Sequence, residues 1–293
     1  MLLSKGTLWV TILSERPGQP GRLLALAASS GRVRRSFRLP VNPLRLVSGF
    51  GSLWLSGQGG GIRHRGILRL DPSSGRVLRV IRAAHGLGWA LAATRHAIWV
   101  AGPDTFPKGH PEKSGVYFVY KIDPHREAVV RRVKLRSTVI DLIGNGSAVW
   151  VTGWAAVMKL AESGRPLFRQ PIIGAGWSVA RAGEGVWVTH TFYGSRRDKQ
   201  PPPARELLRI QEGSTPHLTR LPLEDSPWQV SAAASVAWIA AGHPSHQVLS
   251  LADTQPPSTP TEVPVSGIVR TVEAAPRGAW VAQQNPNQLS RVC

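Results

Sequence analysis

Cysteine is nearly absent from this chain of 293 residues, since the only one is the last residue, Cys293. A single thiol excludes an intramolecular disulfide and a cysteine-based metal site within one chain. No run of about 18 apolar residues occurs, so the sequence offers no membrane-spanning helix. Carboxylates are scarce, with 17 Asp and Glu against 36 Lys and Arg, and the chain therefore carries a formal net charge of +19.

Several common catalytic motifs are missing as well. The glycine-rich run over residues 57–61 lacks the Lys-Ser/Thr pair of a phosphate-binding loop, and no Gly-x-Ser-x-Gly elbow or His-Glu-x-x-His segment occurs. No zinc finger, helix-turn-helix or RNP-like segment accompanies the basic charge, so we expect no sequence-specific recognition of nucleic acid. Residues 1–6 do not begin the basic and then apolar pattern of a secretory signal, so no signal peptide is visible.

Tryptophan, by contrast, occurs 11 times, and seven of these residues belong to one repeated motif. In each copy a small or polar residue is followed by an apolar residue, then tryptophan, then an aliphatic residue. Successive copies are 37 to 51 residues apart, which is typical of solenoids and propellers. The motif tryptophans are Trp9, Trp54, Trp99, Trp150, Trp187, Trp238 and Trp280.

Each repeat is predicted to form four short strands, because its apolar residues alternate or cluster between Gly, Pro, Asn and Ser. In the second repeat the expected strands are 44–48, 52–56, 67–70 and 77–81, with a tight turn at 71–75.

A second tryptophan pattern defines the register within the repeats. Trp89, Trp177 and Trp228 each precede the motif tryptophan of their own repeat by ten residues. We expect all ten of these indoles to pack between neighbouring sheets, since aromatic rings dominate burial in such folds. Trp154 belongs to neither pattern and is expected to be exposed.

Seven four-stranded repeats of this length predict an all-β fold, a seven-bladed β-propeller of antiparallel blades. The form Gly-x-Leu-Trp-Val followed by Ile-Asp-Pro-x-x-Gly resembles the YVTN and virginiamycin B lyase-like propeller superfamily, most closely over residues 68–77. The resemblance extends over the whole chain and implies one β-propeller domain, residues 1–293. It implies no single activity, because that superfamily includes enzymes, sensors and binding scaffolds.

The ends of the chain depart from the repeat. Aligning Trp9 on Trp54 shortens the first strand of the first repeat, and residues 289–292 form a third strand with no fourth after it. We therefore expect a domain that lacks its N-terminal closing strand. The resemblance implies the cell envelope or secretion, whereas the sequence itself leaves the location unknown.

The positive charge is unevenly distributed. Residues 1–150 contain 23 Lys and Arg against 7 Asp and Glu, whereas residues 151–293 contain 13 against 10. The excess lies on the expected fourth strands, the outer rim of a propeller, where it could attract an anionic polymer or a membrane surface. A GC-rich coding sequence is the competing explanation, since 29 of the 36 basic residues are arginine. The residues of this basic band are Arg32, Arg34, Arg35, Arg38, Arg76, Arg79, Arg82, Arg131, Arg132, Lys134 and Arg136.

The connections after the tryptophan strands differ most in length, and all leave the same end of the repeats. They are expected to converge on one face, here called the loop face, and loops on a rigid scaffold commonly carry function. We predict a ligand site there for a small molecule or a protein, anionic rather than cationic. Its candidate residues are His64, His110, His190, Tyr193, Arg196, Arg197 and His246.

The function expected from these observations is that of a non-catalytic binding or scaffold module that needs no cofactor. The alternative is a lyase-like or hydrolytic enzyme in which loop histidines and a divalent metal provide acid and base chemistry. By the resemblance, His243 and His246 are nearest to the histidines of such enzymes, although their spacing is no standard metal-binding pattern. A second alternative is a sensor domain of a larger envelope protein.

Overall fold

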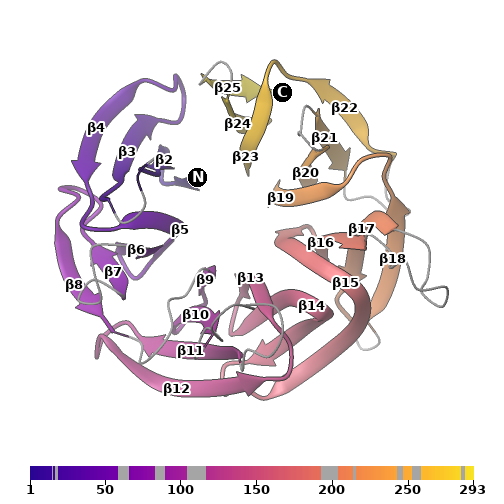
Figure 1. Cartoon of the computed structure of the whole chain (residues 1–293), viewed down its shortest axis with the longest axis horizontal. Coiled ribbons are helices and arrows are strands. Elements are labelled where there is room, and N and C mark those ends of the chain that lie inside the picture. The colour runs from indigo at the N-terminus through magenta and orange to yellow at the C-terminus, as the bar shows by residue number, and fades with distance from the viewer. Residues whose placement is uncertain are drawn as a thin grey trace. The chain divides into compact units, whose positions relative to one another are not determined.

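The computed structural model describes residues 1–14, 16, 19–58, 66–82, 90–103, 117–192, 204–213, 216–242, 247–252, 259–284 and 288–293. Every regular element in these ranges is a β-strand, as the all-β prediction requires (Figure 1). Within the same ranges, no helix is long and apolar enough to cross a bilayer.

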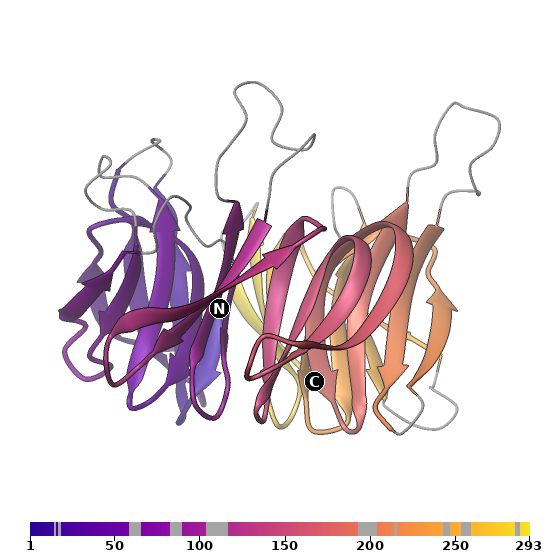
Figure 2. The ribbon, with the colours of Figure 1, turned by 90° about the horizontal axis from the view of Figure 1, so that it is seen from below.

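The chain divides into two compact units. Unit 1 comprises Met1–Gly153 and Val157–Gln170, and unit 2 comprises Trp154–Ala156 and Pro171–Cys293. In both units the strands stand side by side and are joined by turns at their ends (Figure 2).

Unit 1 begins with three sheets of four antiparallel strands, each strand paired with the next one in the sequence. The first sheet contains β1 (Leu2–Ser4), β2 (Thr7–Ile12), β3 (Arg22–Ala27) and β4 (Val33–Arg38). The second contains β5 (Asn42–Gly49), β6 (Ser52–Gln58), β7 (Ile67–Leu70) and β8 (Val77–Ile81). The third contains β9 (Ala90–Ala93), β10 (Ile98–Pro103), β11 (Tyr117–Asp123) and β12 (Ala128–Leu135).

The fourth sheet has six strands in sequence order, and two further sheets follow it. The fourth contains β13 (Val139–Asn145), β14 (Ala148–Ala161), β15 (Pro166–Ala182), β16 (Gly185–Phe192), β17 (Ala204–Gln211) and β18 (His217–Pro222). The fifth contains β19 (Pro227–Ala233), β20 (Val236–Ala241), β21 (Gln247–Ala252) and β22 (Thr261–Pro264). The last contains three strands, β23 (Ile268–Ala274), β24 (Ala279–Gln284) and β25 (Gln288–Val292).

The prediction of seven blades was wrong, because the strands form six sheets. The difference arises at β14 and β15, which have 14 and 17 residues, about twice the length of their neighbours. Each strand continues through residues that the repeat pattern assigns to a connection, and the connections there are too short to interrupt the strand. The repeats of Trp150 and Trp187 consequently share one six-stranded sheet.

The predicted strands of the second repeat are confirmed almost residue for residue, and residues 71–74 form the expected turn before β8. Asp71 stabilises this turn by accepting hydrogen bonds from the backbone N–H of Ser73 at 2.7 Å and from the Ser74 hydroxyl at 3.0 Å. A hydrogen bond from the Ser73 hydroxyl, at 2.7 Å, and the two just described lower the pKa of the Asp71 carboxyl to about 2.

The core lies between successive sheets, with the motif tryptophans at its centre. All seven are buried, with at most 5% of each residue exposed. In unit 1, Trp9 belongs to a cluster that includes Leu55 of the second sheet, and Trp54 to one that includes Ile98 of the third. In unit 2, Trp187 and Trp238 occupy equivalent positions against the fifth and last sheets. The predicted packing between sheets is thus confirmed for Trp9, Trp54, Trp187 and Trp238, and the burial of the other three motif indoles agrees with it.

Candidate functional site

Of the seven residues predicted to bind a ligand on the loop face, the structure describes one. His64, His110, Tyr193, Arg196, Arg197 and His246 lie outside the described residues, as does His243. Their roles stay predictions. Within the described ranges, no group of three or more His, Cys, Asp or Glu side chains is placed to hold a metal ion.

His190 was expected in a connection, but it lies in strand β16 and is 2% exposed. Its Nδ1 is 2.8 Å from Oε1 of Glu206 on β17, and its Nε2 is 2.8 Å from the backbone oxygen of Ile173 on β15. Each ring nitrogen therefore lies within hydrogen-bond distance of an oxygen atom. The ring therefore joins three strands and has internal partners on both nitrogens.

Glu206 lies between the ring of His190 and the guanidinium of Arg220. Nη1 of Arg220 on β18 donates to the same oxygen, Oε1, that accepts from His190. Burial alone raises the pKa of the Glu206 carboxyl, but the hydrogen bond from His190 and the charge of Arg220 outweigh it, and the pKa lies below its ordinary value. The side chain of Glu206 is 11% exposed, whereas that of Arg220 is 48% exposed. His190, Glu206 and Arg220 thus form a charged triad that crosses from the interior to the surface.

Three apolar side chains of unit 2 that are exposed or half-buried lie near this triad, and together they are here called the indole patch: Trp154, Ile173 and Trp177. Trp154 is 46% exposed, as predicted, and Ile173 is 57% exposed. The rings of Trp154 and Trp177 meet edge to face, with centroids 6.4 Å apart. Trp177 is half-buried, and its Nε1 donates to the hydroxyl of Thr191 at 2.6 Å.

Two contacts bring the backbone of β15 at Ile173 and Gly174 close to Thr191. The Ile173 carbonyl oxygen contacts Nε2 of His190, the residue before Thr191, and a Cβ added at Gly174 would come within 2.4 Å of the Thr191 carbonyl oxygen. Thr191 is the penultimate residue of β16, where the connection after the tryptophan strand begins. The indole patch therefore lies at the end of unit 2 for which the loop face was predicted, although its residues were not those proposed.

The basic band predicted from the sequence is exposed along unit 1. All 11 of its residues are exposed, from Arg32 to Arg136. Its strands β4, β8 and β12 are each the last in their sheet and pair with one neighbour only. They follow one another along one side of unit 1 (Figure 1). None of the three strands contains Asp or Glu.

A recurring pair that the sequence reasoning missed lies inside the sheets. In four repeats a cation on the third strand is placed over the motif indole, at 5.5 to 5.9 Å from the ring centroid. Two of these cations also form ion pairs with a carboxylate of the next sheet. Arg69 is 2.7 Å from Glu127, and Lys121 is 3.0 Å from Glu162. The pairs are Trp54 with Arg69, Trp99 with Lys121, Trp150 with Lys159, and Trp187 with Arg209.

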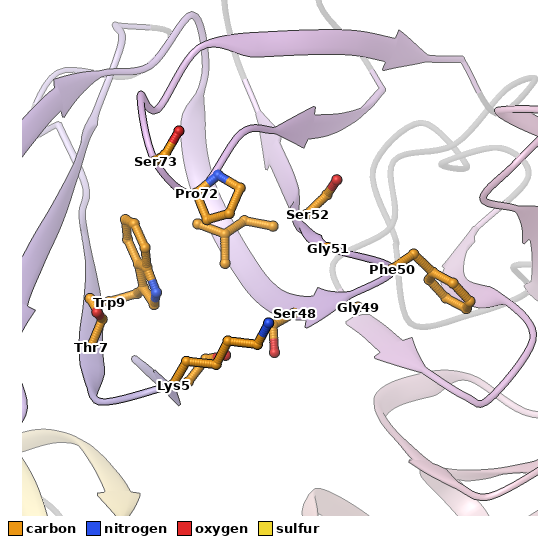
Figure 3. Close-up of a pocket in the computed structure, with 12 residues that line it drawn as sticks. Lys5, Thr7, Trp9, Ser48, Gly49, Phe50, Gly51, Ser52, Pro72 and Ser73 are labelled. Carbon is orange, nitrogen blue, oxygen red and sulfur yellow. The ribbon is translucent and has the colours of Figure 1, made fainter.

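A cavity of about 510 Å³ opens where the strands of the first and second sheets turn. Its lining includes the indole of Trp9, the amine of Lys5 and the hydroxyl of Ser73, whereas the Phe50 ring points away from Trp9 (Figure 3). Lys5 and Phe50 both have positive φ, 47° and 54°, in two-residue turns followed by glycine. These turns join first to second strands, so the cavity is at the strand ends opposite the loop face.

No protein-family model matches this sequence, and no curated protein matches it either. The resemblance to the YVTN-like superfamily therefore has no matching family model to support it. Solved structures do match in fold.

Three of them cover nearly the whole chain. A chain of Kuenenia stuttgartiensis hydrazine synthase has a TM-score of 0.75 and 14% identity, covering 98% of this chain and 93% of its own. The Pan2 WD40 domain of Neurospora crassa has a TM-score of 0.70 and 12% identity, covering 98% and 85%. A chain of the mitotic checkpoint complex has a TM-score of 0.70 and 13% identity, covering 99% and 90%. At such identities the likeness concerns the fold alone, and WD40 repeats form β-propellers. The chain accordingly has a β-propeller fold built from antiparallel sheets.

Proposed function

We propose that this β-propeller is a non-catalytic interaction module that binds a protein partner through the indole patch of unit 2. The observation that carries the proposal is the exposure of Trp154, 46%, on β14 and of Ile173, 57%, on β15. Two of the structures with the same fold are a WD40 domain and a chain of a multiprotein complex, which agrees with a role in protein interaction.

The patch has the chemistry of an interface centre. Tryptophan is enriched among the residues that dominate protein–protein affinity, because its large ring buries much area with few rotatable bonds. About 100 Å² of the Trp154 side chain is open to a partner, which corresponds to roughly 2–3 kcal/mol when buried. Trp177 is fixed by Thr191, so the surface is formed before a partner arrives.

The charged triad provides a rigid support beneath the patch. His190 holds the backbone of Ile173 from inside, and Glu206 and Arg220 in turn fix the ring of His190. His190, which the sequence marked as a binding residue, is here assigned a positioning role.

Affinity capture with variants tests the proposal. Purified wild-type protein, a Trp154→Ala/Ile173→Ser variant and an Ile12→Ala/Leu13→Ser control are immobilised, and proteins retained from an extract of the source cells are quantified. The control residues, in unit 1, are 43% and 58% exposed, which are exposed fractions close to those of Trp154 and Ile173. We expect at least one partner retained by the wild type and the control but lost from the patch variant. Equal retention by all three would refute the assignment.

The enzymatic alternative is tested on the same preparation. Stoichiometric bound metal that a His243→Ala/His246→Ala variant loses would favour a lyase-like or hydrolytic propeller over an interaction module.

Two expectations from the resemblance are part of this proposal as well. The first is membership of the YVTN-like superfamily. The second is a location in the cell envelope, which fractionation of the source cells would test.

A further inference from the structure

We propose that the basic band of unit 1 binds the sugar–phosphate backbone of double-stranded nucleic acid without sequence preference. This site is independent of the proposed function, since it involves different residues of a different unit. It is carried by the exposure and the composition of β4, β8 and β12.

On β12 the band presents cations on both faces of the strand. Successive side chains of a regularly paired strand point to opposite faces, so Arg131 and Arg132, which lie opposite Lys121 and Tyr120, diverge. On β12, Arg132 also lies with its guanidinium carbon 3.5 Å from the Phe118 ring centroid, which fixes the stem of its side chain. A polymer that approaches β4, β8 and β12 therefore meets cations along the whole side of unit 1 (Figure 1).

The five carboxylates that the structure describes in unit 1 all have partners. One of them, Glu127, lies 3.5 Å from Arg79 of the basic band. Asp71 and Asp123 accept hydrogen bonds within their own turns. The remaining three carboxylates are paired with cations outside the band: Glu127 with Arg69, Asp141 with Arg45, and Glu162 with Lys121.

The distribution of cations also argues against coding bias as their cause. Seven of the 19 residues of β4, β8 and β12 are Arg or Lys, against one of the ten residues of β18 and β22. That one, Arg220, is paired with Glu206. A compositional bias would raise the arginine content of all these edge strands alike, whereas among the five compared the excess lies in β4, β8 and β12.

Nucleic acid fits the band better than other anionic partners. Its duplex carries about one charge per 1.7 Å of axis, a density that releases many counterions when cations approach. Arginine, ten of the 11 band residues, matches phosphate with a planar fork of donors. The large apolar side chains exposed on these strands are aliphatic and few, namely Val33, Leu78, Val80 and Val130, whereas membrane-surface binding uses a continuous apolar face with aromatic residues.

The absence of exposed rings also defines the mode of binding. Phe37 is the only aromatic residue of the three strands, and it is half-buried against Trp9. Without rings on which bases can stack, contacts are confined to phosphates, so duplexes of different sequence should bind alike.

Fluorescence anisotropy with labelled 20-base-pair duplexes of two unrelated sequences tests the inference. If about five phosphates are contacted, log Kd should rise with log salt concentration with a slope of about 4.5 between 50 and 200 mM NaCl. An Arg34→Gln/Arg35→Gln/Arg82→Gln/Lys134→Gln variant should bind on the order of 10- to 100-fold more weakly at 0.1 M salt. The matched control, Arg181→Gln/Arg270→Gln/Arg277→Gln/Arg291→Gln, removes the same charge from exposed positions of unit 2 and should bind within about threefold of the wild type.

Three results would overturn the inference. The first is equal loss of affinity in both variants, which would make net charge the cause. The second is a preference of more than about tenfold between the two duplexes, which phosphate contacts cannot produce. The third is tighter binding of phosphatidylserine vesicles, heparin or a polyglutamate peptide than of duplex at equal salt. If the fourfold variant is misfolded by circular dichroism, its two halves, Arg34→Gln/Arg35→Gln and Arg82→Gln/Lys134→Gln, are measured instead, and each should weaken binding at least threefold.

Discussion

Replacing Glu206 by glutamine should destabilise unit 2 through the charged triad. The substitution keeps the size of the side chain but removes a carboxylate that is 11% exposed and accepts hydrogen bonds from His190 and Arg220. A buried hydrogen bond to a charged group contributes about 1.5–3 kcal/mol. Because Arg220 is 48% exposed, solvent screens its share, and most of the loss arises at His190. We expect the free energy of unfolding to fall by about 2–3 kcal/mol at pH 7.

The sign of the pH dependence follows from the lowered pKa of the Glu206 carboxyl. A carboxyl whose pKa is lower in the folded than in the unfolded state contributes stability above the unfolded pKa and loses it as the pH falls through the folded value. The difference between wild type and Glu206→Gln should therefore be largest near neutral pH. It should shrink as the pH drops below the ordinary glutamate pKa of about 4.3.

Urea unfolding followed by tryptophan fluorescence at pH 7 and pH 3.5 measures both quantities. Glu224→Gln is the matched control, because Glu224 is an exposed carboxylate of the same unit and should change stability by less than about 0.5 kcal/mol. A Glu206→Gln protein as stable as the wild type at pH 7 would refute the triad as a stabilising element. So would a difference that stays constant between the two pH values.

Three further changes give separate tests. Trp154→Ala should leave the urea midpoint within about 1 kcal/mol of wild type, because the side chain is 46% exposed, but should remove the fluorescence that acrylamide quenches most readily. Arg69→Met should cost about 1–2 kcal/mol by breaking the Glu127 ion pair and the contact with Trp54, and high salt should narrow the difference in urea unfolding. Gly144→Ala should lower the melting temperature sharply or prevent folding, since the added Cβ would lie 1.8 Å from the Ala93 carbonyl oxygen; a normal melting curve would contradict the close approach of the two strands.

The sequence predicted the elements well wherever local pattern determines them. Strand limits in the second repeat follow from short apolar runs between glycine and proline, and Trp154 departs from the repeat and is exposed. The merging of two repeats into one sheet was not predictable in the same way. The spacing of apolar residues indicates which side chains are buried. It does not indicate whether the backbone hydrogen bonding of a strand continues through a short connection, as it does at residues 154–156 of β14.

The contact between His190 and Glu206 could not be predicted from the local sequence pattern, for another reason. The Nδ1 partner of His190 is Glu206, 16 residues later, and the pairing depends on the register of β16 against β17. The cations over the indoles, in contrast, had a visible signal. The middle residue of the third-strand triplet, such as Arg69 in Leu68-Arg69-Leu70, stands directly opposite the motif tryptophan in the ladder. Working out the pairing of the second and third strands of each repeat would have placed this cation opposite the tryptophan.

The ion pairs between Arg69 and Glu127 and between Lys121 and Glu162 make each of these repeats depend on the next one. Each cation covers the indole of its own sheet, and its counterion lies in the turn after the third strand of the repeat that follows. Excising one repeat would therefore give the preceding cation a new neighbour, and the ion pair would form again only if that neighbour carried an acid in the same turn. Gain or loss of a repeat has to preserve this match between the cation of one repeat and the acid of the next.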